Sequence, residues 1–260
     1  MGNEERVVGA QTIHRALAVL SLLRRATADV GVSDIGQELG LHTSTAHRIL
    51  RALLADGFVS QNPESGRYRL GRESLLLGLG AERTLGFSVA EPLLEQLCEQ
   101  TGESVNLVVR DGDRGLVVLR VDSVQPLRFS QPTGTRIPLY CTSSGKVLMA
   151  FGGDPKAEVD RLGELVALTG STVTSRKALV RELREVQEQG YALNEGERNP
   201  GVSGVAVPVF DAEGQIMAAL ALQGPQVRLP EARLRELGAG LSGVAKEVSV
   251  VLPAAGRVAS

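Results

Sequence analysis

One short amphipathic stretch constrains the fold of this chain more than any other part of it. From position 46 onward, apolar residues recur at helical spacing, at Ala46, Ile49, Leu50, Leu53 and Leu54. This spacing predicts a helix with one buried face. The opposite face carries hydroxyl and cationic side chains and almost no acid, at Thr43, Ser44, Thr45, His47, Arg48 and Arg51. Such side chains can reach base edges and phosphates in a DNA groove, although an ordinary surface helix would show the same apolar stripe.

The residues before this stretch predict two further helices. Apolar spacing predicts the first from Thr12 to about residue 25. A second, short helix is expected over residues 34–39, with Ser33 as its N-cap and Gly40 directly after its end. A helix, a short helix, a tight turn and a longer helix form the order of a helix-turn-helix.

The residues after the stretch predict a hairpin. Two short strands, at residues 58–61 and 67–70, flank a turn that contains Asn, Pro and Gly. On the second strand, Arg67 and Arg69 are expected to point away from Tyr68 because side chains alternate along a strand. A cationic hairpin behind a recognition helix is a wing, so Arg67 joins the predicted DNA-binding residues. A plain surface hairpin is the alternative.

Composition sets the wider limits. A chain of 260 residues can form two ordinary domains, and its 43% hydrophobic and 22% charged residues are normal for a globular protein. The net charge is only −2, but cations outnumber acids between residues 42 and 72. A local basic patch on a nearly neutral body fits a protein that holds nucleic acid at one end. Residues 1–10 are polar and are expected to be frayed.

Cysteine content and hydropathy indicate a cytoplasmic protein. The two cysteines, Cys98 and Cys141, lack metal-ligand spacing and are expected to be reduced and buried. No metal site and no cofactor are predicted. No run of about 18 apolar residues occurs, so no membrane segment is expected.

The N-terminal pattern resembles a known family. Residues 40–50 and the Gly-Arg-Tyr-Arg-Leu-Gly sequence at residues 66–71 are similar to the IclR family of bacterial transcription regulators. Gly36 departs from the family, which commonly has Ala there. The resemblance covers nearly the whole chain. It implies a winged helix-turn-helix over residues 1–72, a linker helix over 73–86 and an effector-binding and oligomerisation domain over 87–260.

The linker and the second domain have their own patterns. Residues 73–85 are too apolar for a free linker and contain two glycines, so a helix packed on a neighbour or on another copy of the chain is expected. Helices are further predicted at 89–100, 175–189 and 230–251, and strand pairs at 105–109 with 116–121 and at 205–210 with 216–222. These patterns predict an α+β domain on an antiparallel sheet. The resemblance implies a GAF-like, ligand-sensing domain and a dimer contact at the linker.

A small-residue stretch at residues 140–150 carries the chemistry of this domain. A P-loop is rejected because Tyr140 and Val147 stand where that motif needs Gly and Ser or Thr. The Ser143-x-x-Lys146 spacing matches a serine nucleophile motif, which makes a hydrolase or acyl-transfer enzyme the alternative function, but its partner motifs are absent. The preferred interpretation is a helix N-terminus whose N–H groups bind a carboxylate. A helix cap without a ligand remains open.

The family's effector pocket implies further residues. By position in the family, the pocket would be lined by Phe129, Ile137, Ser143, Ser144, Asn194, Val202, Gly204, Ala221 and Gln223. Relatives that bind small hydrophilic acids often have an acid and hydroxyl or thiol groups where this chain has Asn194, Gly204, Ala221 and Gln223. We therefore hypothesise a roomier, more apolar pocket for an aromatic or similarly bulky organic acid.

These patterns together predict a regulator and not an enzyme. The expected protein is a homodimer or a dimer of dimers that binds a double-stranded operator and responds to a small organic acid, typically for a catabolic operon. A DNA-binding protein whose second domain only oligomerises is a weaker alternative. The operator, the effector and the sign of regulation do not follow from the sequence.

Overall fold

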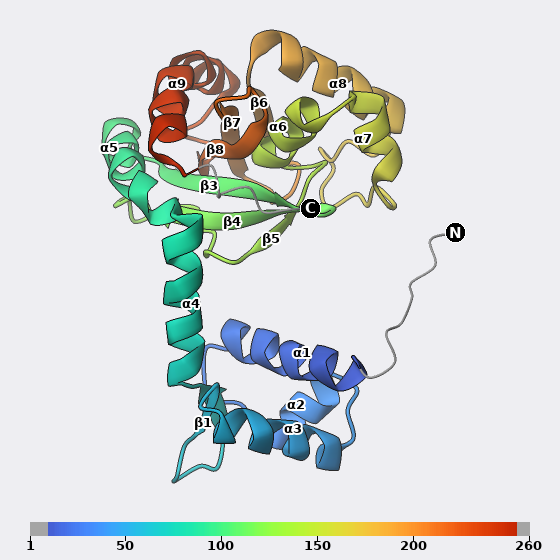
Figure 1. Ribbon diagram of the computed structural model, residues 1–260. Helices are drawn as coiled ribbons and strands as arrows, with labels where there is room; N and C mark the ends of the chain where they lie inside the picture. The colour runs from blue at the N-terminus through green and yellow to red at the C-terminus, as the bar shows by residue number, and fades with distance from the viewer. Residues whose placement is uncertain (1–9, 254–260) are drawn as a thin grey trace. The chain divides into compact units, whose positions relative to one another are not determined.

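The computed structural model describes residues 10–253, and the chain divides into two compact units, residues 1–83 and 84–260 (Figure 1). The frayed end expected for residues 1–10 falls on positions that, except for Ala10, lie outside the described residues. Each unit has its own hydrophobic core.

The first unit is a helix-turn-helix followed by a hairpin, as predicted. Its elements are α1 (Gln11–Arg25), α2 (Val32–Glu38), α3 (Thr43–Ala55), β1 (Val59–Gln61), β2 (Tyr68–Leu70) and α4 (Arg72–Leu85). The core is aliphatic, with Val19 from α1, Ile35 from α2 and Leu50 from α3 all fully buried. Tyr68 on β2 joins them. Leu54, which the apolar stripe placed on the buried face, remains 38% exposed at the end of α3.

The turn before α3 depends on glycine. Gly40 has φ +62°, a left-handed conformation that favours glycine, as expected for a residue after a helix end. A Cβ at Gly36 would lie 3.0 Å from the carbonyl oxygen of Leu41, so glycine relieves crowding there. The start of α2 was predicted wrongly. The helix begins at Val32, and the Asp34 carboxylate accepts a hydrogen bond from the N–H of Gly31 at 3.3 Å, so Ser33 lies inside the helix.

Helix α4 exposes its apolar side chains. None of its residues is buried, and Leu75, Leu76, Leu77 and Leu79 expose between 50% and 65% of their surface. Ser74 fastens its start, because its hydroxyl donates to the carbonyl of Phe58 at 2.7 Å. The packing expected for this helix is therefore not supplied within the first unit, and a second copy of the chain remains the predicted partner.

The second unit is built on one antiparallel sheet with the strand order β5-β4-β3-β8-β7-β6. Its strands are β3 (Ser104–Asp111), β4 (Arg114–Val121), β5 (Arg136–Pro138), β6 (Ala192–Glu195), β7 (Val202–Phe210) and β8 (Ile216–Pro225). Its helices are η1 (Phe87–Ala90), α5 (Glu91–Thr101), α6 (Ser143–Gly152), α7 (Pro155–Arg161), α8 (Arg176–Gln189) and α9 (Glu231–Val251). The two predicted hairpins and the mixed α+β class are confirmed, whereas β5, β6 and α7 were not predicted.

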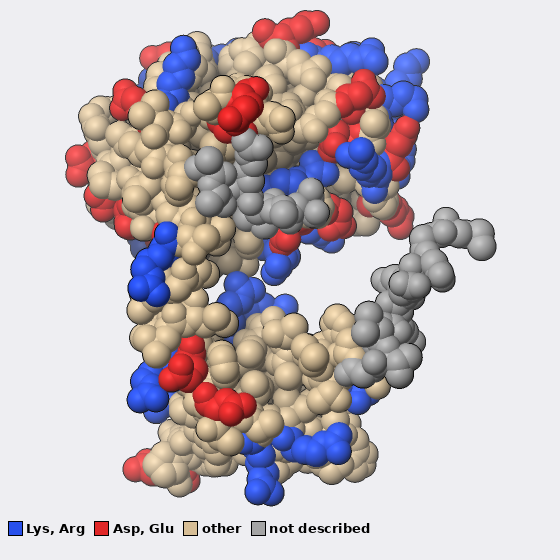
Figure 2. Space-filling view, in the orientation of Figure 1, with Lys and Arg blue, Asp and Glu red and all other residues tan. Residues whose placement is uncertain are grey.

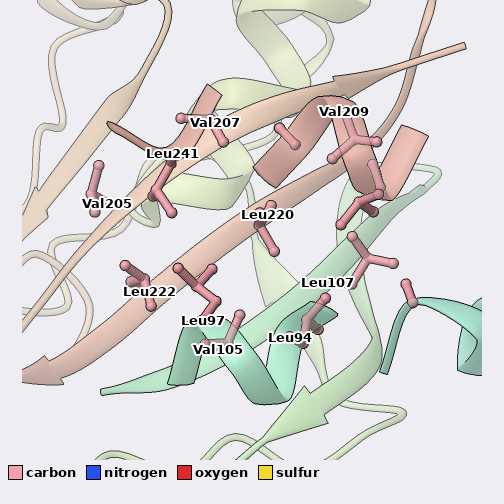
Figure 3. Close-up of a cluster of buried hydrophobic side chains, with 14 of the residues drawn as sticks. Leu94, Leu97, Val105, Leu107, Val205, Val207, Val209, Leu220, Leu222 and Leu241 are labelled. Atoms are coloured by element: carbon pink, nitrogen blue, oxygen red, sulfur yellow. The ribbon is translucent and has the colours of Figure 1, made fainter. Parts of the chain in front are cut away.

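Helices cover both faces of this sheet. On one face, leucine and valine side chains from α5, β3, β7, β8 and α9 point toward one another (Figure 3). On the other face, α6 packs over a floor of small residues that includes Ala206, Ala219 and Ala221, and α7 and α8 pack against α6 and against each other. The small side chains let α6 lie close to the strands. This arrangement brings the N-terminus of α6 to the end of the sheet where Asn194, Gly204 and Gln223 are paired neighbours.

Neither a membrane-spanning helix nor a metal-binding cluster occurs among the described residues. No helix there is long and apolar enough to cross a membrane. Among the same residues, no group of three or more His, Cys, Asp or Glu side chains could hold a metal ion.

Candidate functional sites

The polar face of α3 is an exposed cationic surface. Thr43, Ser44, His47, Arg48 and Arg51 are exposed, and Thr45 is half-buried. The structure shows no hydrogen bond or ion pair from the side chains of His47, Arg48 or Arg51 to any other described residue. Figure 2 shows basic side chains over α3 on this unit. Because Ile49 and Leu50 bury the opposite face, the arginines are presented outward on a fixed helix.

Both arginines of the wing are exposed, but only one of them forms an ion pair. The Arg67 guanidinium donates to the Asp34 carboxylate at 2.8 Å and to the carbonyl of Asp29 at 2.8 Å, so it ties the wing to the start of α2. Arg69 is exposed, and its only recorded partner among the described residues is the Ser60 hydroxyl, at 3.3 Å. Arg67 was predicted as a DNA-binding residue and Arg69 was not, because alternation along a strand cannot show which arginine pairs with an acid.

The second unit contains a pocket at the N-terminus of α6. It encloses about 300 Å³, counting space open to solvent. Six of the nine predicted effector residues line it: Phe129, Ser143, Asn194, Val202, Gly204 and Gln223. Five more lining residues were not predicted: Gln131, Thr142, Arg198, Asn199 and Ser203.

Three predicted residues lie outside the pocket lining. Ile137 and Ala221 are fully buried in the core beneath α6. A Cβ at Gly115 would approach Ile137 to 3.0 Å, which shows how closely Ile137 packs on the sheet. Ser144 is also fully buried, and its hydroxyl has no hydrogen-bond partner among the described residues.

The start of α6 is fixed by its cap and by a glycine. The Thr142 hydroxyl accepts a hydrogen bond from the N–H of Gly145 at 3.1 Å and donates to the carbonyl of Pro138 at 2.8 Å. A Cβ at Gly145 would lie 2.2 Å from the carbonyl oxygen of Leu139. The Ser-Gly-Lys sequence therefore serves close chain packing at this helix end, and it places Thr142 and Ser143 on the pocket.

Lys146 is a buried ion-pair centre. Its Nζ lies 2.5 Å from Glu182 Oε1 on α8 and 2.5 Å from Glu197 Oε1, and 3.4 Å from the carbonyl of Leu193. Burial raises the pKa of the Glu197 carboxyl, while the neighbouring Lys146 opposes that shift. An amine whose N–H groups face two carboxylates and a carbonyl has no lone pair to offer Ser143. The geometry therefore gives no support to a Ser143–Lys146 nucleophile.

The Lys146 cluster is connected to the pocket through Asn194. The Asn194 amide donates to the carbonyl of Cys141 at 2.6 Å and accepts from the N–H of Glu197 at 3.3 Å. Burial raises the pKa of the Cys141 thiol to about 11, so this thiol stays protonated at neutral pH. Asn194 thus joins the segment before α6 to the loop after β6 and fixes one wall of the pocket.

The pocket lining is mixed in polarity. Most of its side chains are polar, including Gln131, Asn194 and Gln223, but apolar atoms contribute more of the lining surface than polar atoms do. The fully enclosed part of the pocket is narrow. A bulky acid would thus need the walls to move apart, and the hypothesis now depends on such an opening.

We expect Gly204→Ala to destabilise the second unit by about 1–3 kcal/mol, because overpacking forces neighbours to move. The new Cβ would lie 2.7 Å from the carbonyl oxygen of Leu222 and 3.0 Å from Gln223 Cγ. Thermal denaturation measures the effect. The matched control is Gly243→Ala on α9, where nothing lies within 4 Å and alanine should be neutral or stabilising. Equal stabilities for the two variants would contradict the crowding at Gly204.

Comparisons with known proteins agree with this two-part architecture. The model of the "IclR helix-turn-helix domain" matches residues 12–63, and that of the "bacterial transcriptional regulator IclR C-terminal" domain matches residues 84–250. The chain is 34% identical to the HTH-type transcriptional regulator XynR of Escherichia coli K12, over 86% of this chain and 90% of that protein. It is 30% identical to the HTH-type transcriptional repressor AllR of Salmonella typhimurium, over 94% and 90% of the respective chains.

A similar solved structure contains a ligand. The crystal structure of an IclR homologue from Microbacterium hydrocarbonoxydans, complexed with 4-hydroxybenzoate, matches this fold with a TM-score of 0.79 at 26% identity. The match covers 95% of this chain and all of that one.

Proposed function

We propose that this chain, which belongs to the IclR family of bacterial transcriptional regulators, binds operator DNA through α3 and the wing and responds to a small organic acid in the pocket at α6. In this proposal Thr43, Ser44, Thr45, His47 and Arg48 face the bases of the major groove. Arg51, on the next turn of α3, and the wing contact the DNA backbone. The acid shifts the protein between a state that binds the operator and one that does not, and DNA changes the affinity for the acid to the same degree.

One observation carries the DNA-binding part of the proposal. The cationic side chains of α3 have no partner among the described residues, while the same helix buries Ile49 and Leu50 in the core. Exposed, uncommitted arginines on a rigid helix are the groups that pair with guanine edges and phosphates. Arg67 differs, because its ion pair with Asp34 must open or be shared before it can contact DNA.

The effector part has separate support. Six residues expected from the family line one pocket, and a homologue has been crystallised with 4-hydroxybenzoate. An aromatic carboxylic acid is therefore our proposed class of effector, and the regulated genes would serve its catabolism. Binding of such an acid would widen the narrow space between Phe129 and the end of the sheet.

We also propose that the protein works in the cytoplasm as a homodimer or a dimer of dimers. The exposed leucines of α4 provide an apolar surface that a second copy would cover. A symmetric pair of recognition helices would read the two halves of a palindromic operator.

The proposal is tested by gel-shift titration of the full-length protein on the DNA upstream of its own gene and of the adjacent operon. We expect one retarded complex whose affinity changes when an aromatic acid, such as 4-hydroxybenzoate, is added. Short aliphatic acids such as glyoxylate serve as the comparison. Equal retardation of shuffled DNA would contradict the operator part of the proposal. A response to short aliphatic acids alone would contradict the effector part.

A further inference from the structure

Arg198 lies on a loop that the structure holds firmly against the pocket. The Thr169 hydroxyl donates to the carbonyl of Gly196 at 2.8 Å, and the Thr172 hydroxyl donates to the carbonyl of Glu197 at 2.6 Å. At the other end of the loop, the carbonyl of Gly201 accepts the N–H of Gln226 at 2.8 Å. A side chain on such a loop is presented in one place, as a binding residue has to be.

The charge of Arg198 is not balanced by the protein. Within the described chain, Arg198 is the only charged residue that lines the pocket, and no carboxylate there lies within 4.0 Å of its guanidinium. The adjacent acid, Glu197, instead faces Lys146. Burial lowers the pKa of Arg198, which shows that the guanidinium has lost water without gaining a compensating acid.

Other cations near the core of this unit are paired. Arg110 lies 2.8 Å from Glu158, and Arg228 lies 2.6 Å from Glu103. Partly buried cations are costly unless an anion compensates them. Arg198 therefore differs from its counterparts in having an open position for an anion.

A second unpartnered donor lies in the same lining. Gln131 is 4% exposed, and its Nε2 has no hydrogen-bond partner among the described residues. Buried amide groups normally form hydrogen bonds, so this N–H₂ group is free to donate to a molecule bound in the pocket. The hydroxyl of Ser143, at the positive end of the α6 dipole, lines the same space. A cation, an amide N–H₂ and a helix N-terminus together suit a ligand that supplies acceptors and negative charge.

We propose that Arg198 and Gln131 bind the carboxylate of the effector, and that Arg198 makes the pocket selective for anions over neutral molecules of the same shape. This inference rests on the proposed function in placing the effector in this pocket. The carboxylate would accept two hydrogen bonds from the guanidinium and one from Gln131.

The test is titration calorimetry and thermal denaturation of full-length wild type, Arg198→Gln and Arg198→Lys. The probes are acetate, benzoate, 4-hydroxybenzoate, the neutral isostere 4-hydroxybenzamide and inorganic phosphate. We expect at least one carboxylate to bind wild type more tightly than the amide does. Arg198→Gln should weaken binding of that carboxylate about 10- to 100-fold. Arg198→Lys should weaken it less, because lysine keeps the charge but loses the planar, two-pronged donor geometry of the guanidinium.

Stability without ligand separates a binding role from a structural one. We expect Arg198→Gln to melt at the same or a higher temperature than wild type, because it removes an unpaired, partly buried charge. The control is Arg181→Gln, whose side chain is 77% exposed on α8 and which should leave every measurement unchanged.

Three results would overturn the inference. In the first, no carboxylate binds wild type more tightly than it binds Arg198→Gln. In the second, wild type binds the acid and the amide with equal affinity. In the third, phosphate binding depends on Arg198 but the binding of no carboxylate does. Gel shifts with the same variants show whether such a result refutes only the role of Arg198 or also the proposed function. A protein that still binds its operator and still responds to an acid without Arg198 would refute only the role of Arg198.

Discussion

Replacing Lys146 with methionine is expected to destabilise the second unit by about 3–5 kcal/mol, because it leaves the buried Glu197 carboxylate without its cation and close to the partly exposed carboxylate of Glu182. The Glu197 side chain is only 9% exposed and that of Glu182 is 29% exposed. Methionine nearly matches the volume of lysine, so the loss would come from charge and not from a cavity. Urea denaturation followed by far-ultraviolet circular dichroism measures it.

The chain offers a matched control for this variant. Lys156 on α7 pairs with Asp160 at 2.6 Å, but both side chains are largely exposed, at 70% and 56%. An exposed pair contributes about 0–1 kcal/mol, so Lys156→Met should change little. If Lys146→Met were no more destabilising than Lys156→Met, the buried pair would not be holding α6 to the loop after β6. A double variant that also carries Glu197→Gln should recover part of the lost stability.

The pH dependence of Lys146→Met follows from Glu197. Burial already raises the pKa of this carboxyl, and removal of Lys146 takes away the largest opposing influence. Between the unfolded and folded pKa values, the folded state binds more protons than the unfolded state, so stability falls as pH rises through that window. The stability difference between wild type and variant should therefore grow from pH 5 toward neutral pH. A difference that is constant over this range would contradict the assignment to Glu197.

Local patterns were sufficient for most of the fold. The helical stripe of α3 and the glycine after α2 involve residues a few positions apart, so the sequence shows them directly. The strands β5 and β6 have three and four residues, too few for an alternation to be visible. They are strands because β4 and β7 present partners to them, and that information is tertiary. Similarly, α2 starts at Val32, two residues before the predicted start, because the Asp34 carboxylate accepts the N–H of Gly31. The sequence alone did not show that Gly31, and not Ser33, would be the N-cap.

The pocket could be predicted only where family position was informative. Ser143, Asn194 and Gly204 meet there as the resemblance implied, but Arg198 gave no signal. In the sequence it stands beside an acid in a polar loop, which is typical of a solvated turn. Only the fold shows that Glu197 turns toward Lys146 and leaves Arg198 to face the pocket. Lys146 shows the opposite case, a motif that misleads. Its spacing from Ser143 suggested a catalytic pair, but its carboxylate partners come from α8 and the loop after β6.

Arg48→Ala is expected to have the largest effect on DNA binding. Arg48 lies on the exposed face of α3, near its N-terminal end, the part of a recognition helix that contacts bases. One good arginine–guanine pair is worth roughly 1–3 kcal/mol. That corresponds to about 5- to 150-fold per half-site, and a dimer on a palindrome would lose the square of this factor. Fluorescence anisotropy with labelled operator measures the affinity, and a shuffled duplex measures specificity.

Arg51→Ala is the informative comparison, because Arg51 lies one turn later on the same helix and is expected to contact phosphate. Arg51→Ala should lower the affinity for operator and for shuffled DNA to the same degree. It should also reduce the salt dependence of binding by about one ion per site. Arg48→Ala should instead lower the ratio of operator to shuffled affinity. Because the two units have separate cores, ligand binding should survive both changes. Loss of ligand binding in Arg48→Ala would mean that the units are not independent. If Arg48→Ala left the ratio of operator to shuffled affinity unchanged, Arg48 would not recognise bases. The α3 surface would then bind DNA by charge alone.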